Sequence, residues 1–341
     1  MTEPSPWGRK NAHQDAPTQE FSTQEFSTQE SPTMGSFQRF YERDLKAELF
    51  ALERERPAKL KAFYLISGAA VAAGLTAALI LLTMTQINPQ FLLVIGIIVI
   101  WAGFMAYRPL RKLQQDAKIR TMTSLCRFLG LSYRLQPKNV SLGRLGELDL
   151  IPSYNEKKLE DQISGDVRGV GFDLFEAKLI RKTRDSKGRT RRTTVFRGLL
   201  CEFDFHKNFA GTTIITRDHT KFGNFFAKYG KMGERIKLED PEFERMFEVY
   251  GTDQVESRYL LTPAFMERTR RLNHMVGAGN LQLAFDKGRL LLAIKKSGGS
   301  FEGGSAFSNL TDITRIEKTI QELTLIYDVV EKLRLELETR V

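Results

Sequence analysis

The chain has 341 residues, of which 42 % are hydrophobic and 27 % are charged, and its formal net charge is +10. These proportions are ordinary for a folded protein and exclude a chain that is disordered throughout. The positive balance favours an anionic partner, such as lipid headgroups or nucleic acid.

Residues 1–36 are poor in aliphatic side chains and rich in Ser, Thr, Gln, Glu and Pro. The unit Phe-Ser-Thr-Gln-Glu occurs at residues 21–25 and again at 26–30. A short polar repeat buries too little apolar surface to offset the entropy of the chain, so we expect a disordered tail. Its two phenylalanines leave open a docking motif, although a linker made by repeat expansion is the simpler interpretation.

Residues 37–61 have the period of a juxtamembrane amphipathic helix, which we expect either to lie along the membrane or to pack on the cytoplasmic domain. We expect Pro57 to mark its end or the first turn of the next helix. The apolar positions that share one face of this helix are Phe37, Phe40, Tyr41, Leu45, Leu49 and Leu52.

Two apolar runs follow, at residues 62–84 and 91–107, and neither contains a charged residue. A helix as long as the first run spans roughly 34 Å, which is enough to cross a bilayer, and the second is at the short end of the spanning range. The long polar stretch before them favours an uncleaved anchor over a secretory signal peptide. We therefore predict a transmembrane hairpin.

The basic residues around the hairpin predict its orientation. Lys and Arg flank both outer ends, whereas the connector at residues 85–90 has none. The positive-inside bias then places both termini in the cytoplasm. The flanking bases are Arg54, Arg56, Lys59 and Lys61 before the pair, and Arg108, Arg111, Lys112, Lys118 and Arg120 after it.

Small residues recur at helical spacing in both runs, including Gly74 in the first and Gly96 and Gly103 in the second. Such residues let helix backbones approach closely in lipid. The two spans pack on each other in the simpler interpretation, and a seam between two chains is the alternative. Trp101 lies too deep for an interfacial belt, so we expect it to pack inside the bundle.

A linking helix is predicted at residues 109–130, followed by a cytoplasmic α+β domain at residues 131–341. Alternating apolar and polar residues predict an antiparallel sheet. Its expected strands are residues 133–135, 163–167, 171–180, 194–205, 212–216 and 235–238, with a hairpin at 281–285 and 289–294.

Capping signals predict three helix starts, at Asp240, Asp253 and Thr262. Each offers a side-chain oxygen to the first turn, and Pro241 and Pro263 follow two of them directly. Asp253 and Glu256 have the spacing of a capping box. A long amphipathic helix is expected last, over about residues 311–337.

The most distinctive charge cluster lies at an expected hairpin tip, where seven bases accompany one acid, Asp185. A solvated hairpin tip is the simpler interpretation, and contact with an anionic lipid surface, an acidic protein or nucleic acid is the alternative. No aromatic residue is interleaved, so stacking on single-stranded nucleic acid is disfavoured. The seven bases are Arg181, Lys182, Arg184, Lys187, Arg189, Arg191 and Arg192.

No catalytic, cofactor-binding or metal-binding residue is predicted. His206 and His219 are separated by thirteen positions, without the tight spacing of a metal motif. Cys201 lies in an expected strand and is interpreted as a buried thiol. Phosphate-binding loops, nucleophile elbows and zinc-protease signatures are absent from the sequence.

Three stretches together resemble the bacterial family called domain of unknown function 3137, over roughly residues 120–340. They are Val195 to Leu199, Asn208 to Thr212, and Glu239 to Pro263 with its Phe247-Glu248-Val249-Tyr250 segment. Ser257 stands where the family more often has Ala. The resemblance implies two membrane spans before the domain, a bacterial inner membrane and a LemA-type membrane protein as a partner, but no activity.

The function expected from these observations is that of a membrane-tethered cytoplasmic binding or scaffolding module. The alternative is a membrane-bound enzyme whose site is not visible in the sequence.

Overall fold

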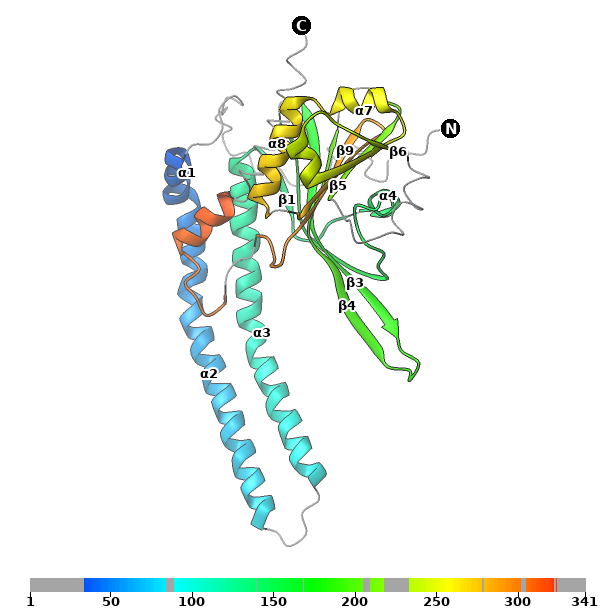
Figure 1. Ribbon diagram of the computed structural model, residues 1–341. Helices are drawn as coiled ribbons and strands as arrows, with labels where there is room; N and C mark the ends of the chain where they lie inside the picture. The colour runs from blue at the N-terminus through cyan, green and yellow to red at the C-terminus, as the bar shows by residue number, and fades with distance from the viewer. Residues whose placement is uncertain are drawn as a thin grey trace. The chain divides into compact units, whose positions relative to one another are not determined.

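The computed structural model divides into two compact units, a helical unit formed by residues 32–128 and 301–321 and a sheet unit that contains residues 129–300 (Figure 1). The structure describes residues 34–83, 89–138, 140–167, 169–204, 209–217, 233–277, 279–301, 305–321 and 323.

The helical unit consists mainly of two long helices. The first begins as α1 (Met34–Phe40), passes through one π-helical segment, η1 (Tyr41–Leu45), and continues as α2 (Lys46–Thr83). The second is α3 (Pro89–Phe128), so the segments expected at 91–107 and 109–130 form one helix. Residues 313–321 add a further helical segment, and the rest of the long helix expected to reach residue 337 lies outside the described residues, apart from residue 323.

Both prolines inside these helices are accommodated without a break. The expectation that Pro57 ends one helix or begins the next is wrong, because α2 continues through it, and α3 continues through Pro109. A proline inside a helix costs about 3 kcal/mol. Burial close to each proline offsets that cost, by Leu52 before Pro57 and by Ala106 and Leu110 around Pro109.

The apolar face predicted for residues 37–61 is buried in the helical unit. Phe37, Tyr41, Leu45, Leu49 and Leu52 are all buried, as the helical period predicted. The rings of Phe37 and Phe40 pack on Phe128 near the end of α3, with centroids 6.5 and 4.7 Å away. The side chains of this core from α3 and the C-terminal segment include Leu110, Leu113, Met122, Leu125, Leu310, Ile316 and Ile320.

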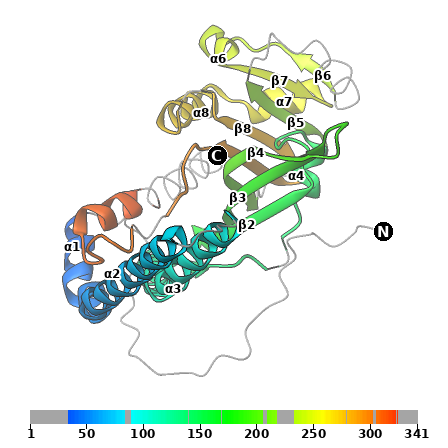
Figure 2. The ribbon, with the colours of Figure 1, turned by 90° about the horizontal axis from the view of Figure 1, so that it is seen from below.

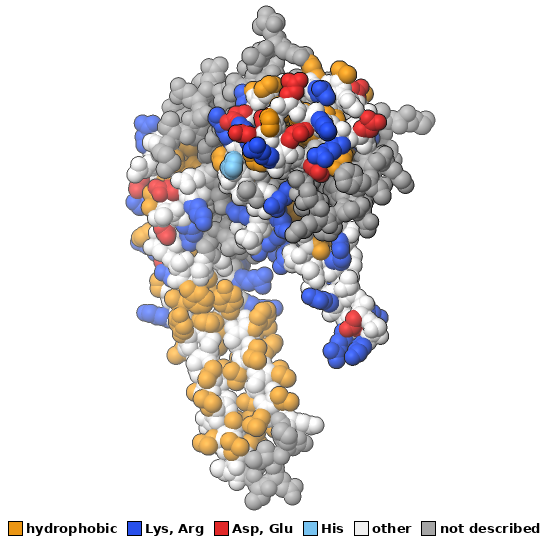
Figure 3. Space-filling view, viewed as in Figure 1, with side chains coloured by type: hydrophobic (Ala, Val, Ile, Leu, Met, Phe, Trp, Pro, Cys, Tyr) orange, Lys and Arg blue, Asp and Glu red, His pale blue; other side chains and the backbone are white. Residues whose placement is uncertain are grey.

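The remaining lengths of α2 and α3 expose apolar side chains along their surfaces (Figure 3). Both are long and apolar enough to cross a membrane, with mean hydropathies of 2.3 and 2.1 in their most apolar stretches. They are two candidate membrane-spanning helices. Trp101 is 61 % exposed, so the expectation that it packs inside the bundle is wrong for the single chain. It belongs to the same outward apolar surface, since it faces away from the partner helix.

The two helices approach closely at Gly74. A Cβ atom there would lie 2.6 Å from Cγ2 of Val99, so only glycine lets the helices meet at this point. Cβ atoms placed on Gly96 and Gly103 would have no neighbour within 4 Å among the described residues. Packing of the two spans on each other is thus the interpretation that holds for Gly74.

The sheet unit contains a nine-stranded sheet among the described residues, in the order β1-β2-β3-β4-β9-β8-β5-β7-β6. Every neighbouring pair is antiparallel, which confirms the predicted α+β class. The strands are β1 (Ser132–Arg134), β2 (Glu156–Val167), β3 (Val170–Arg184), β4 (Thr190–Asp204), β5 (Thr212–Arg217), β6 (Glu234–Ile236), β7 (Phe247–Gly251), β8 (Leu281–Asp286) and β9 (Arg289–Lys295).

Helices and loops cover both faces of this sheet (Figure 2). On one face, Leu145 of α4 (Gly143–Glu147) packs in a cluster with Leu200 and Ala284. On the other, Phe265 of α8 (Pro263–Met275) contacts Phe285 of β8, with ring centroids 5.3 Å apart. Successive side chains of a strand point to opposite faces, so Ala284 and Phe285 anchor the two layers.

The three predicted caps are present in the sheet unit. Asp240 caps α6 (Pro241–Met246), Asp253 caps α7 (Gln254–Leu260), and Thr262 caps α8, each by accepting backbone N–H groups of the first turn. Strand β7 was not predicted. It follows α6 without a connecting turn and all five of its residues are buried, so it lacks the alternation that marks a half-buried strand.

Candidate functional site

The seven predicted bases lie on a two-stranded ribbon formed by the ends of β3 and β4 (Figure 1). The pairing of β2 with β3 ends at Ile180, and β9 pairs with β4 only from Gly198 onward. The intervening strand ends pair with each other as far as Arg184 and Thr190. Residues 181–194 are all exposed. We call residues 181–192 the basic ribbon.

The only acidic residue of the basic ribbon, Asp185, is hydrogen-bonded within the turn. Oδ1 of Asp185 accepts the backbone N–H groups of Lys187 and Arg189, at 3.0 and 2.8 Å. Gly188 has a φ of +77°, a left-handed conformation that glycine adopts without strain. The Asp185 carboxylate is therefore part of the turn, and the charge at the tip is basic.

Basic side chains project from both faces of the ribbon. Residues directly opposite each other in a β-ladder share a face. Lys182 pairs with Arg192 on one face, and Thr183 pairs with Arg191 on the other. A planar anionic surface would therefore meet basic groups whichever face it approached.

Four of the seven bases are held by neighbours at the root or turn of the ribbon. Lys182 and Arg192 both form ion pairs with Glu156, and the hydrogen bond from Lys182 lowers the pKa of this carboxyl group. Arg181 donates to the backbone oxygen and Oγ of Ser153, and Arg184 donates to the backbone oxygen of Gly188.

The other three bases are Lys187, Arg189 and Arg191. Their side chains make no hydrogen bond or ion pair within the part of the chain that the structure describes. The end of the ribbon accordingly appears as a cluster of basic side chains (Figure 3). These three are the ribbon bases most available to a partner.

A second group of residues joins two segments that carry the family resemblance. The carboxylate of Glu256 accepts the backbone N–H groups of Ala210 and Gly211, at 2.9 and 2.7 Å. Thr252 exchanges bonds with Thr212: its Oγ1 accepts the Thr212 N–H at 2.8 Å, and its own N–H donates to the Thr212 oxygen at 3.0 Å. The loop before β5 is thereby tied to the start of α7.

Small residues permit this junction. Ser257 is fully buried, and its Oγ lies 2.7 Å from Oγ1 of Thr213. A Cβ on Gly251 would lie 2.3 Å from the same Oγ. Elsewhere in the matched segments, a Cβ on Gly198 would lie 1.9 Å from the backbone oxygen of Ile294. The contacts of Ser257 with Thr213 and of Gly198 with Ile294 join distant segments, so sequence spacing could not reveal these structural roles.

Two buried carboxylates of the sheet form ion pairs with arginines. Glu202 pairs with Arg289, and Asp286 pairs with Arg144. Burial raises the pKa of Glu202 to about 7, although the Arg289 guanidinium opposes that shift.

The thiol predicted to be buried is buried. Cys201 is a free cysteine, and burial raises the pKa of its thiol. Within the described ranges no three His, Cys, Asp or Glu side chains are arranged to hold a metal ion. His206 and His219 lie outside those ranges.

The fold defines a protein with a two-helix apolar hairpin followed by an α+β domain that carries an exposed basic ribbon. The model of the family described as "Protein of unknown function (DUF3137)" matches residues 194–335, and this segment belongs to that family. The match confirms the resemblance seen in the sequence. It includes the Glu256 junction and begins two residues beyond the end of the basic ribbon.

No curated protein matches the chain. The crystal structure of the mycobacterial trehalose monomycolate transport factor A, TtfA, is similar with a TM-score of 0.32 and 10 % sequence identity. The similarity covers 63 % of this chain and 96 % of that chain.

Proposed function

We propose that this protein is a non-enzymatic binding module anchored in the bacterial inner membrane, with both termini in the cytoplasm, and that its basic ribbon binds anionic lipid headgroups. Lys187, Arg189 and Arg191, which have no partner in the described part of the chain, support this proposal most directly. They project from an exposed ribbon whose only acid is occupied by the turn.

The charge distribution around the hairpin supports the proposed orientation. Basic residues flank the outer ends of both spans, and the connector between them has none. The anionic lipids of the inner leaflet would then face the same compartment as the sheet unit.

The energetics favour a weak, salt-dependent contact. A basic residue near an anionic membrane surface contributes about 1 kcal/mol, so the three unpartnered bases together contribute about 3 kcal/mol. The four bases held at the root or turn contribute less, since they must leave existing partners. Added salt screens the attraction beyond roughly 10 Å at 0.1 M ionic strength.

The test uses the full chain in nanodiscs. An environment-sensitive fluorophore is attached to Ser186→Cys at the ribbon tip, while the native Cys126 and Cys201 are buried. We expect a blue shift in discs that contain phosphatidylglycerol relative to discs of phosphatidylcholine alone. The shift should disappear at 0.5 M salt, a concentration at which the screening length is below about 10 Å.

Two triple variants distinguish an effect of the basic ribbon from an effect of net charge alone. Lys187→Glu, Arg189→Glu and Arg191→Glu together should abolish the shift. Lys138→Glu, Lys237→Glu and Arg258→Glu make the same change in charge at exposed positions elsewhere in the sheet unit and should preserve it. Equal emission in both kinds of disc rejects lipid binding. Capture of a polyglutamate probe by the wild type alone would then indicate an acidic protein partner.

A further inference from the structure

Four aromatic rings from three segments meet where the apolar parts of α2 and α3 begin and end. Phe63 and Tyr64 come from α2, Tyr107 comes from α3, and Phe307 comes from the C-terminal segment. The Phe307 ring is stacked on Tyr107 with centroids 6.1 Å apart, and lies 5.8 Å from Phe63 and 6.5 Å from Tyr64. We call these four residues the aromatic cluster.

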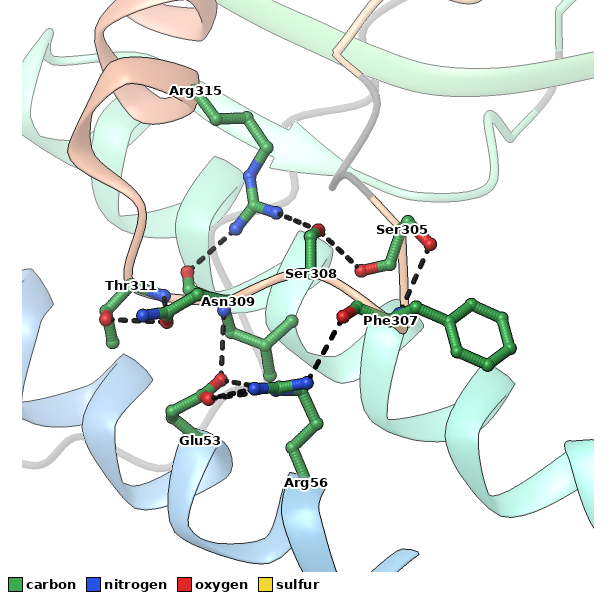
Figure 4. Close-up of polar contacts among 9 residues, drawn as sticks. Glu53, Arg56, Ser305, Phe307, Ser308, Asn309, Thr311 and Arg315 are labelled. Carbon is green, nitrogen blue, oxygen red and sulfur yellow. Dashed lines mark hydrogen bonds and ion pairs between the residues drawn. The ribbon is translucent and has the colours of Figure 1, made fainter. Parts of the chain in front are cut away.

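Polar contacts hold the loop that carries Phe307 against α2 (Figure 4). Arg56 donates to the backbone oxygen of Phe307 at 3.3 Å, and Glu53 accepts the N–H of Leu310 at 3.0 Å. Glu53 and Arg56 also form an ion pair at 2.7 Å and are both 16 % exposed. These contacts fix the loop on one side of the helix.

The far end of the loop is fixed as well. The Tyr41 hydroxyl donates to the backbone oxygen of Thr311 at 2.9 Å. Arg315 donates to the backbone oxygen of Leu310 at 2.8 Å and to Oγ of Ser308 at 3.4 Å. Because the loop is held by hydrogen bonds at both ends, Phe307 has a fixed position along α2.

This position along α2 is at the edge of the apolar hairpin. Phe63 and Tyr64 follow Lys61 at the start of the first apolar run, and Tyr107 precedes Arg108 at the end of the second. Aromatic rings are enriched at this level in membrane proteins, where their flat apolar bodies lie among the headgroups. A hairpin that crosses a bilayer thus carries Phe307 at the depth of its headgroup layer.

Part of the aromatic cluster is exposed and can contact lipid. Phe307 is 44 % exposed and Tyr64 is 60 % exposed. Leu65 and Phe104 continue this exposed apolar surface onto the two helices. The bilayer is the occupant that fits, because the surface of Phe307 is continuous with the surface that the spans present to lipid.

We propose that residues 305–311 form a third membrane contact besides the two spans. In this contact Phe307 lies in the headgroup layer and holds the C-terminal segment, residues 301–321, at the membrane surface. This inference rests on the spanning hairpin of the proposed function, but not on the basic ribbon. It assigns a lipid-facing role to a loop that is about 200 residues from the spans in sequence and is positioned wholly by tertiary contacts.

Spin labels measure the depth directly in the full chain in liposomes. Labels are placed singly at Phe307→Cys, at Leu79→Cys inside the first span, and at Glu48→Cys on an exposed polar face of α2. Accessibility to oxygen, which partitions into lipid, is compared with accessibility to a water-soluble nickel chelate. We expect position 307 to fall between the other two, with at least a twofold higher oxygen-to-nickel ratio than position 48.

A ratio at position 307 equal to that at position 48 overturns the inference. An aqueous signal at Leu79 as well would overturn the spanning hairpin itself, so the two failures are distinguishable. A second variant preserves the ring in case cysteine loosens the loop: Phe307→Trp with Trp7 and Trp101 replaced by Phe. Lipids brominated near the headgroup should quench this tryptophan more than aqueous iodide does, and the reverse order rejects lipid contact.

Discussion

The carboxylate of Glu256 accepts the backbone N–H of Gly211 at 2.7 Å, although the two residues are 45 positions apart. Its other oxygen accepts the N–H of Ala210. In the capping box expected from the sequence, Glu256 would have turned back to the N–H of Asp253. Asp253 does cap the helix, through the N–H groups of Val255 and Glu256, while the Glu256 side chain serves the loop before β5 instead.

Replacing Glu256 should therefore destabilise the sheet unit. Glu256→Ala removes two hydrogen bonds to a charged acceptor, each worth about 1.5–3 kcal/mol, and the solvent exposure of the loop reduces the net loss to about 2 kcal/mol. Glu256→Gln keeps one acceptor oxygen and should lose about half as much. Thermal unfolding of the full chain in detergent, followed by circular dichroism, measures the effect. Glu239→Ala, at an exposed position without such a bond, is the control, and an equally stable Glu256→Ala chain would contradict the assigned role.

The small side chain of Ser257 lies against Thr213 and Gly251, so we predict that changes at positions 257 and 251 lower the stability of the sheet unit. Ser257→Ala loses the bond to Thr213 and the bond that its hydroxyl donates to the backbone oxygen of Asp253, and should cost about 2 kcal/mol. Gly251→Ala should cost more, because its Cβ would lie 2.3 Å from the Ser257 hydroxyl and 2.6 Å from Cδ1 of Ile236. The double variant removes the first of these clashes, so its loss should be smaller than the sum of the single losses. Strict additivity in a double-mutant cycle would show that the two positions do not interact.

The meeting point of the two apolar helices supplies a third prediction. Gly74→Ile should separate the helices, since even a Cβ there would lie 2.6 Å from Val99. We expect a loss of about 1–3 kcal/mol, the usual cost of overpacking. Titration with dodecyl sulfate, followed by the rate at which an added oxidant forms a disulfide between two cysteines placed one on each helix, measures the change. Gly96→Ile adds the same side chain where a Cβ has no near neighbour and should have little effect.

Glu202 should make stability fall as the pH rises from about 4.5 to about 7. Burial raises its pKa to about 7 from an ordinary value of 4.5, and Asp204 and Asp173 raise it further against the attraction of Arg289. In that window the folded chain holds a proton that the unfolded chain has released, so the free energy of unfolding decreases by up to about 1.4 kcal/mol per pH unit. Glu202→Gln should flatten this part of the profile in thermal melts at several pH values, whereas Glu239→Gln should not. A wild-type profile that is level or rises across the window contradicts the prediction.

Local patterns predicted several parts of this fold correctly because their causes are local. The caps at Asp240 and Thr262 need only a side-chain oxygen and the first helical turn, and a proline follows each. The buried face that includes Leu45 and Leu49 follows from helical period alone. The hairpin of β8 and β9 follows from two apolar runs around a turn that contains Gly288.

Patterns that depend on a neighbour were missed or misinterpreted. Strand β7 is buried throughout between β5 and β6, so its residues lack the alternation that would have marked it. Pro57 was expected to end a helix or to begin the next, and Pro109 to begin the linking helix, yet α2 and α3 continue through them. Packing close to each proline compensates for the lost hydrogen bond. The seven ribbon bases were recognisable as a cluster, but nothing in their spacing distinguished the four that have partners from the three that have none among the described residues.

The apolar hairpin, the sheet-rich domain and the basic cluster could be predicted from the amino-acid sequence, because hydrophobic period, turn chemistry and charge are properties of contiguous residues. The bond between Glu256 and a loop 45 residues away, and the contact of Phe307 with Tyr107 at the edge of the apolar helices, are visible in the folded chain alone. A hydrogen bond or ring contact depends on distance in space, which separation along the chain does not encode.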